Sequence, residues 1–229
     1  SSSDSHMMKN SEWGAAAYLS HSKYGVNREV YTNNAESYFT GRSGGNVGGS
    51  TPINKTYTDQ TSTEKYNYYG YYTWDGYLLI YGTNRKSSTR DLTKVASTTG
   101  NITGIYDMAG GSIEYVMVYY SGASTTWGAT SSNNYAGFSS APDSKYYDNY
   151  TTTSALTACN GGVCYGHGLL ETSGWYGDSL GFVKADMPWL CRGANSITMD
   201  SRVGVFNGYG SIGGGAGSYS FRSVMVNVG

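Results

Sequence analysis

The chain has 229 residues, which is enough for one large domain or two small ones. Its formal net charge is −1 and only 14% of its residues are charged. A nucleic-acid partner is therefore not expected, because nucleic-acid binding needs a clustered basic face. The sequence also has no basic amphipathic helix of the kind that binds a membrane surface. No linker-like stretch divides the sequence, and we expect a single domain.

Tyrosine and glycine are in excess, with 24 and 33 residues, whereas proline occurs only 3 times. Turns must then be made mainly by Gly and Asn, and the core must rely on Tyr and Trp, whose polar ends need partners when buried. Tyr, Ser, Gly and Asn also dominate recognition loops, because Tyr offers a large contact area at a low entropic cost. The composition fits a binding surface, and it fits equally well a secreted β-rich protein without a special site.

The N-terminal residues Ser1 to Met7 are interpreted as an expression-tag remnant and are excluded from the fold. Residues 8–229 then form the expected single domain. Its first element is a helix over Glu12 to Leu19, because the run Ala15 to Ala17 has high helix propensity and Ser11 is a suitable N-terminal cap.

Short strands and long loops are expected along the rest of the chain. The Asp75-Gly76 pair within Tyr66 to Tyr81 indicates a hairpin, since it separates two β-forming runs. Residues 32–65 and 121–153 are polar and have no clear period, so they are expected to be loops. The other expected elements are a loop leading into a short strand over 23–30, one helical turn within 87–99, strands over 113–120, 199–206 and 221–228, and a flexible connector over 208–217.

The three cysteines bear on the compartment in which the protein works. Cys159 and Cys164 enclose Asn-Gly-Gly-Val, and we expect them to form a small disulfide loop in which the glycines supply the turn. A zinc site is the alternative, but it needs a second ligand pair, and of the histidines only His167 is near in sequence. A disulfide implies an oxidising compartment outside the cytoplasm. Cys191 is then an unpaired, buried thiol.

Three segments in the C-terminal half form one pattern. Gly100 to Tyr115 reads GNITGIYDMAGGSIEY, Arg192 to Ala194 reads RGA, and Ser220 to Val224 reads SFRSV. In this order they resemble the motifs G-(L/I)-Y-D-M-x-G-N-V-W-E-W, R-G-G and G-F-R-V of the formylglycine-generating-enzyme-like group. The resemblance implies an irregular α+β fold of the C-type-lectin-like class, with short strands and long loops, over residues 8–229.

Glu114 is an acidic residue in an otherwise apolar strand, and a buried carboxylate must be paired or hydrogen-bonded. Arg192 and Arg222 are its natural partners, because a guanidinium binds a carboxylate through two hydrogen bonds. We therefore interpret these groups as a scaffold network rather than as catalytic residues. The framework expected around the site consists of Asp107, Glu114, Trp189, Arg192, Phe221 and Arg222.

A closer resemblance covers nearly the whole chain. The phrases MKNSEWGAAAYLSHSKYG (8–25), TACNGGVCYGH (157–167) and ETSGWYG (171–177) are similar to exported proteins of gut Firmicutes. In those proteins a type IV pilin-like helix, which this sequence lacks, precedes a lectin-like domain. The C-terminal layout resembles the variable proteins of diversity-generating retroelements. Their motif P-W-F-x-R-G-G appears here as PWLCRGA (188–194), where the final alanine restricts the backbone more than glycine does.

Such variable proteins change exposed positions of a C-type-lectin fold in order to change their ligand. The resemblance implies a variable binding surface between Arg192 and Arg222, displayed at a bacterial cell surface. Its ligand would be a protein or glycan on another cell or phage, and its mechanism would be recognition without catalysis. The positions expected to contact the ligand are Ala194, Asn195, Ser196, Thr198, Asp200, Arg202, Asn207, Tyr209, Ser211 and Ile212.

Two other functions remain open. The first is a structural pilin-like subunit of a surface filament, which would assemble through the missing N-terminal helix. The second is an oxidase of the formylglycine-generating type, which binds copper through a cysteine pair near its C-terminus. Because Cys159 and Cys164 precede the RGA segment and Cys191 is embedded in it, no catalytic residue is carried over from that family.

Other chemistry has weaker support. His167 and Ser173 lack the G-x-S-x-G turn of a hydrolase nucleophile, and the acidic pairs 107/114 and 143/148 have simpler structural explanations. No cofactor is expected apart from calcium, which C-type-lectin-like folds bind through oxygen ligands although no EF-hand-type loop is present. The candidate calcium ligands are Asp178, Asp186 and Asn195.

Overall fold

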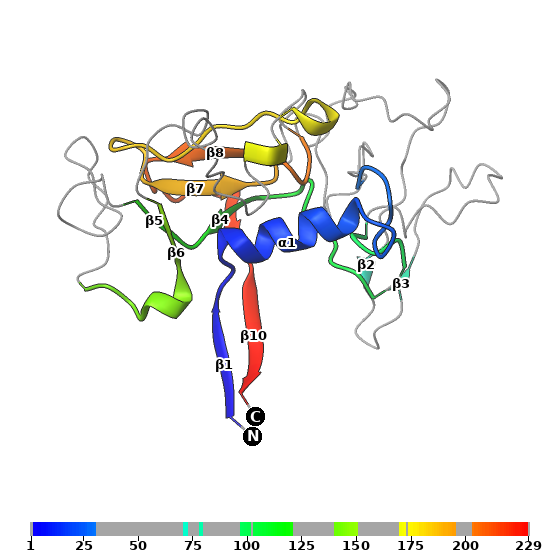
Figure 1. Cartoon of the computed structure of the whole chain (residues 1–229), viewed down its shortest axis with the longest axis horizontal. Coiled ribbons are helices and arrows are strands. Elements are labelled where there is room, and N and C mark those ends of the chain that lie inside the picture. The colour runs from blue at the N-terminus through cyan, green and yellow to red at the C-terminus, as the bar shows by residue number, and fades with distance from the viewer. Residues whose placement is uncertain are drawn as a thin grey trace.

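The computed structural model describes residues 2–30, 71–72, 78–79, 97–101, 103–120, 140–150, 170–172, 174–195 and 203–228. In this part of the chain, short strands form one four-stranded sheet and three two-stranded pairs, accompanied by one α-helix (Figure 1). The 3₁₀ turns η2, η3 and η4 span Ser144–Tyr146, Leu170–Thr172 and Trp175–Gly177.

The four-stranded sheet is the centre of the molecule. It consists of β4 (Ile113–Val116), β7 (Trp189–Arg192), β8 (Gly208–Ser211) and β9 (Tyr219–Phe221) in the order β8-β7-β4-β9. β7 runs antiparallel to both β4 and β8, whereas β9 runs parallel to β4. The sheet therefore assembles the C-terminal segments around β4, which lies within the strand expected over 113–120.

The register divides the sheet into two faces, because side chains alternate along a strand. Val116 and Leu190 are paired neighbours on one face and are fully buried. The helix α1 (Asn10–Ser20) packs on this face and buries Trp13, whose indole N–H donates to the Val205 carbonyl oxygen at 2.8 Å (Figure 1). This side of the sheet is the hydrophobic core, and the opposite face carries the residues that line the candidate site.

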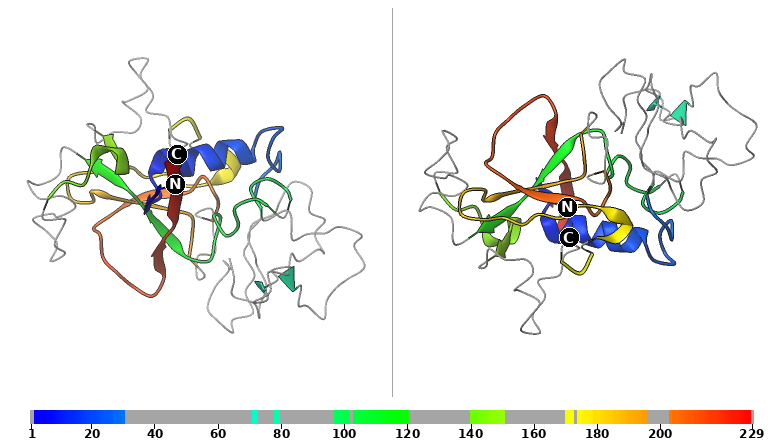
Figure 2. Two further views of the ribbon diagram at one scale, coloured as in Figure 1. Left: turned by 90° about the horizontal axis from the view of Figure 1, so that it is seen from below. Right: turned by 90° about the horizontal axis from the view of Figure 1, so that it is seen from above.

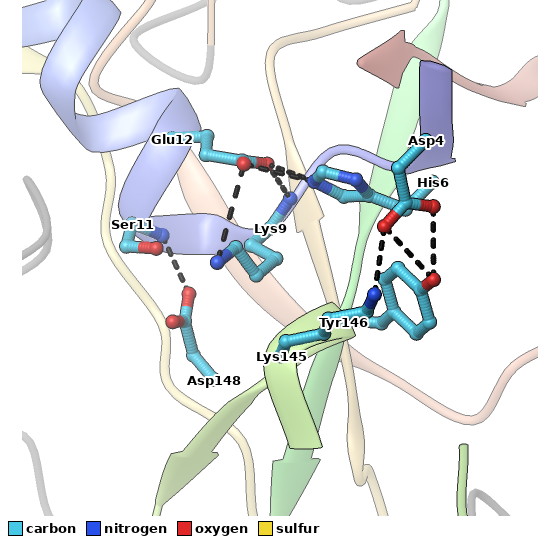
Figure 3. Close-up of polar contacts among 8 residues, drawn as sticks. All are labelled: Asp4, His6, Lys9, Ser11, Glu12, Lys145, Tyr146 and Asp148. Atoms are coloured by element: carbon cyan, nitrogen blue, oxygen red, sulfur yellow. Dashed lines mark hydrogen bonds and ion pairs between the residues drawn. The ribbon is translucent and has the colours of Figure 1, made fainter. Parts of the chain in front are cut away.

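Helix α1 begins two residues earlier than expected, and the expected Ser11 cap is wrong. Lys9 occupies the N-cap position, and its backbone N–H donates to the Glu12 carboxylate at 2.8 Å. The Ser11 backbone N–H donates to the Asp148 carboxylate at 2.6 Å (Figure 3). Two carboxylates thus satisfy free N–H groups at the helix start, and both carry the charge that the helix dipole favours there.

The N-terminal residues, excluded from the fold on sequence grounds, form a strand in the structure. β1 (Ser2–Met7) pairs antiparallel with β10 (Ser223–Val228), and the ribbon projects from the body with both chain ends at its tip (Figures 1 and 2). Asp4 bonds Lys145 and Tyr146 of η2, each at 2.8 Å, and His6 lies 2.8 Å from Glu12 (Figure 3). The segment is therefore tied to the domain by backbone and side-chain contacts.

Two of the expected strand regions are confirmed, each with a break. Residues 113–120 form β4 and β5 (Val118–Tyr120), separated at Met117, which bridges to Lys9. β5 pairs in parallel with β6 (Asp148–Tyr150). Residues 221–228 are split between β9 and β10. β2 (Tyr71–Tyr72) and β3 (Leu78–Leu79) pair antiparallel, as the expected hairpin requires, while its Asp75-Gly76 turn lies outside the described residues.

Other expectations were wrong. The supposed flexible connector over 208–217 begins with β8, because β7 offers it a complete row of backbone partners. Residues 203–206 contain no strand, and the rest of the strand expected over 199–206 lies outside the described residues. Residues 23–30 are turns and bends without a strand. None of the helices in the described ranges is long and apolar enough to cross a membrane.

Candidate functional site

A pocket of about 360 Å³ opens where β4, β7 and β8 meet. Ile113 begins β4, Tyr209 belongs to β8, and Asn207 directly precedes β8. The described residues that line it are Ile113, Ser179, Gly193, Ala194, Asn195, Asn207 and Tyr209. This volume lies within the range of pockets that hold small ligands or ligand side chains.

The backbone around the pocket is fixed by Gly193 and Asn207. Gly193 ends β7 with a φ of 69°, and a Cβ there would lie 2.8 Å from the Met108 carbonyl oxygen. This position therefore requires glycine. Asn207 is buried, and its side-chain nitrogen donates to the Gly193 carbonyl oxygen at 2.5 Å. The hydrogen bond joins the chain leaving β7 to the chain entering β8.

Asp178 supports the turn that leads into β8. It is buried, and its carboxylate accepts a hydrogen bond from the Phe206 backbone N–H at 3.0 Å. A Cβ at Gly204 would overlap this carboxylate, so the turn before β8 is built around it. Asp178 was considered on sequence grounds only as a calcium ligand, because its contact with residue 206 is not visible in the local sequence.

Aromatic side chains cover the sheet face next to the pocket. Tyr115, Cys191 and Tyr209 are neighbours across β4, β7 and β8. The Tyr115 ring stacks on Tyr219 at a centroid distance of 5.3 Å and meets Trp189 edge-on at 5.9 Å. Tyr115, Trp189, Tyr209 and Tyr219 are half-buried, and together they form what we call the aromatic face.

The aromatic face is held by hydrogen bonds as well as by ring contacts. The Tyr115 hydroxyl donates to the Gly214 carbonyl oxygen at 2.8 Å and lies 3.0 Å from the Ser211 hydroxyl. These bonds fix the chain after β8 beside the sheet. The segment that was expected to be a flexible connector is therefore anchored at Ser211 and Gly214.

The electrostatic character of this face is neutral. Burial raises the pKa of Tyr115 to about 12 and that of Tyr209 also above its usual range. Burial likewise raises the pKa of the Cys191 thiol to about 12. Since a thiol reacts as the thiolate, Cys191 is inert near neutral pH. The face can thus donate and accept hydrogen bonds and offer ring contacts.

The structure divides the expected ligand-contact positions into three groups. Asn195 and Tyr209 are half-buried at the pocket and Ile212 is 41% exposed, as a contact surface requires. The expectation of exposure was wrong for Ala194, Asn207 and Ser211, which are buried because they close the pocket wall or hydrogen-bond within the fold. The positions that lie outside the described residues are Ser196, Thr198, Asp200 and Arg202.

The expected ion pair between Glu114 and Arg222 is present. Arg222 binds the carboxylate through two hydrogen bonds, Nε to Oε2 at 2.9 Å and Nη2 to Oε1 at 2.5 Å. Burial raises the pKa of Glu114, and the guanidinium opposes that rise. Arg222 follows β9, so this pair ties the end of the parallel strand to β4.

Arg192 is placed differently from the expectation that it also pairs with Glu114. It is fully buried, and its guanidinium carbon lies 5.9 Å from the centroid of the Trp13 ring. Burial lowers its pKa to about 10, and the nearby acidic groups that oppose this are Tyr150, Asp178 and Glu171. Arg192 thus joins α1 to the sheet, and it remains charged near neutral pH.

The remaining framework residues divide as follows. Trp189 packs against Tyr115, and Asp107 takes a left-handed φ of 64° immediately before the fully buried Met108. Phe221 was also expected to belong to the framework, but it is 64% exposed and does not pack in the core. Cys191 carries a free, buried thiol as expected, while Cys159 and Cys164 lie outside the described residues.

Two of the three candidate calcium ligands are engaged in other contacts, and the third, Asn195, lines the pocket. Asp178 binds the Phe206 N–H, and the exposed Asp186 pairs with Lys184 at 3.2 Å. Across the described ranges, no group of three or more His, Cys, Asp or Glu side chains is arranged to hold a metal ion.

Four residues of this surface were not predicted from the sequence: Ile113, Tyr115, Ser179 and Tyr219. For β4 a signal existed: alternation along Ile113–Val116 places Ile113 and Tyr115 opposite Glu114. Ser179 and Tyr219 reach the site through long-range pairing, which the local sequence does not encode. Comparisons with protein-family models, curated proteins and solved structures found no match to this chain.

Proposed function

We propose that this protein is a non-catalytic, extracellular binding module with a C-type-lectin-like fold, whose ligand surface is the pocket together with the aromatic face. The observation that carries the proposal is the pocket of about 360 Å³ between Asn195, Asn207 and Tyr209, bordered by half-exposed aromatic rings. Rigid rings supply contact area with little loss of entropy, and the amides supply adaptable hydrogen bonds.

The chemistry of this surface favours recognition over catalysis. Burial raises the pKa values of the Tyr115 and Tyr209 hydroxyls and of the Cys191 thiol further above neutrality, so none of these three groups is activated as a nucleophile. A nucleophilic mechanism would need such a group to be activated by a lowered pKa or an adjacent base. A neutral surface of this kind suits a protein or glycan ligand presented on another cell or phage.

The resemblance to retroelement variable proteins adds the idea of a changeable surface. Within the described residues, the positions that fit this role are Asn195, Tyr209 and Ile212, because their side chains reach the surface. Asn207 and Ser211 are better suited to constant roles, because they hold the chain around the pocket. Anchoring at a bacterial cell surface belongs to the same proposal.

Sequencing this locus in several isolates tests the changeable surface. Substitutions should be frequent at positions 195, 209 and 212 and rare at 193, 207 and 211, and a near-copy of the segment should lie beside a reverse-transcriptase gene. An even spread of substitutions over buried and exposed positions would contradict the proposal.

Binding itself can be tested on an array of immobilised glycans and on a panel of whole bacterial cells and phage particles, with the fluorescently labelled chain as the probe. Tyr209→Ala should remove binding to every surface that the wild type recognises. Tyr24→Ala is the matched control, because Tyr24 is 75% exposed and does not line the pocket. Equal loss in both variants, or binding that survives Tyr209→Ala, would place the ligand surface elsewhere.

A further inference from the structure

The strand β10 carries exposed apolar side chains. Met225 is 77% exposed and Val226 is 42% exposed. Among the described strands, β10 pairs only with β1 (Ser2–Met7), and the two form a ribbon that projects from the body (Figures 1 and 2). An isolated two-stranded ribbon is marginally stable in water, and an unprotected edge strand is a template for further pairing.

The direction of the free backbone groups follows from the register. The Met8 N–H donates to the Arg222 carbonyl oxygen at 2.8 Å, and these residues continue the β1–β10 register. In an antiparallel pair, hydrogen-bonded and non-hydrogen-bonded positions alternate. Val224 and Val226 therefore direct their backbone groups toward β1. Ser223, Met225 and Asn227 direct theirs toward the outer edge.

The two edges of the ribbon differ in their protection. β1 carries Asp4 and His6, and Asp4 is bonded to Lys145 and Tyr146 of η2 (Figure 3). Charged side chains and a covering segment are the usual means by which proteins protect an edge strand. β10 has neither a charged residue nor a proline. Its outer edge is thus the one suited to another strand.

The sequence of β10 identifies that strand. Ser223-Val-Met-Val-Asn227 has the same polarity when it is read in either direction. If a second β10 pairs antiparallel around Met225, then Met225 faces its own copy, Val224 faces Val226, and Ser223 faces Asn227. Every cross-strand pair joins side chains of like polarity without opposing charges, which is the favourable arrangement.

We propose that the outer edge of β10 is a homodimer contact, in which two copies of this chain join their ribbons into one four-stranded antiparallel sheet. The two-fold axis passes beside Met225, and the interface is self-complementary, as a two-fold contact requires. The ribbon projects away from β7 and β8, so the contact leaves the pocket uncovered (Figure 1). A dimer would present two copies of the ligand surface, and a multivalent target would then be bound with higher avidity.

Proline substitutions at matched positions test the contact. Met225→Pro removes an outward N–H of β10 without removing a hydrogen bond to β1. Ser5→Pro is the control, because Ser5 is the direct partner of Met225 and its N–H points to the opposite edge of the ribbon. In sedimentation velocity across a wide concentration range, wild type and Ser5→Pro should reach twice the chain mass of 24.6 kDa, and Met225→Pro should remain at that mass.

Several outcomes would overturn the proposal. They are a wild type that stays monomeric at every concentration, a Met225→Pro variant that still dimerises, and a dimer that is lost in Ser5→Pro but kept in Met225→Pro. Circular dichroism shows whether each variant is folded.

A cysteine at the symmetry axis gives a second measurement that does not depend on proline. Cα atoms of a hydrogen-bonded antiparallel pair lie about 5.5 Å apart, a separation that a disulfide spans. Under mild oxidation Met225→Cys should form a covalent dimer on a non-reducing gel, and Ser5→Cys and the wild type should not. Equal cross-linking of both cysteine variants, or cross-linking of neither, would exclude the proposed register.

Discussion

The side-chain nitrogen of Asn207 donates a hydrogen bond to the carbonyl oxygen of Gly193, 2.5 Å away, and so joins the chain leaving β7 to the chain entering β8. Both residues line the pocket. The bond is buried, and it holds together the two ends of the segment in which most of the expected ligand contacts lie. The stability of the fold and the shape of the ligand surface therefore depend on the same contact.

The first prediction concerns this bond. Asn207→Ala should lower the free energy of unfolding by about 1–3 kcal/mol, because the Gly193 carbonyl loses a buried donor. Urea denaturation measures the change. Asn227→Ala on the exposed part of β10 is the control and should change stability little. Equal stability of Asn207→Ala and the wild type would show that this hydrogen bond does not stabilise the junction between β7 and β8.

The second prediction concerns the glycine-rich segment after β8. Gly213 has a φ of 87°, and a Cβ there would overlap the Trp189 indole. Gly213→Ala should therefore destabilise the protein by about 1–2 kcal/mol from the left-handed conformation alone, and the displaced indole should change its fluorescence. Gly215→Ala is the matched control, since a Cβ there meets no atom within 4 Å. The same melting temperature for both variants would mean that the segment is not anchored at Trp189.

The third prediction concerns the ion pair between Glu114 and Arg222. In Arg222→Gln the buried carboxylate loses its guanidinium, so burial raises the pKa of Glu114 further above its ordinary value of 4.5. The folded state then binds this proton more tightly than the unfolded chain. The stabilising contribution of the protonated Glu114 is fully present below the pKa of the unfolded chain. It is lost as the pH rises through the raised pKa of the folded state.

Arg222→Gln should accordingly lower the free energy of unfolding by about 3 kcal/mol at neutral pH. The loss should be much smaller at a pH near the ordinary pKa of a glutamate. Urea denaturation of variant and wild type at both pH values checks this. Lys184→Gln removes the exposed ion pair with Asp186 and should have little effect at either pH. A loss that is the same at both pH values would contradict the role of the Glu114 charge.

The fourth prediction concerns Asp4 in β1. Hydrogen bonds from Lys145 and Tyr146 lower the pKa of this carboxyl below its ordinary value of 3.8. Because the pKa of Asp4 is lower in the folded state, the ionised carboxylate stabilises the fold above pH 3.8. This stabilisation is lost as the pH falls through the pKa of the folded state.

Asp4→Asn should flatten the acid limb of a plot of melting temperature against pH, and added salt should reduce the difference from wild type. Asp186→Asn, which changes an exposed carboxyl, is the control. If Asp4→Asn leaves the acid limb unchanged, then β1 is not held to η2 by this contact.

The sequence by itself determined the local features of this protein. The alanine run before Leu19 gave the helix, and the alternating apolar pattern of residues 223–228 gave β10, because both depend on propensities that act within a few residues. The need of Glu114 for a cationic partner also followed from one rule about buried charge, and Arg222 meets it.

Only the tertiary structure decided which residues reach the ligand surface. β8 forms from a glycine-rich segment because β7 pairs with it, and β1 forms because β10 does. Arg192 turns toward Trp13 because α1 covers its face of the sheet, and Asn207 is buried because Gly193 lies within reach of its amide. Each of these outcomes depends on a contact between residues far apart in the chain, so no pattern within a short stretch of sequence could have predicted it.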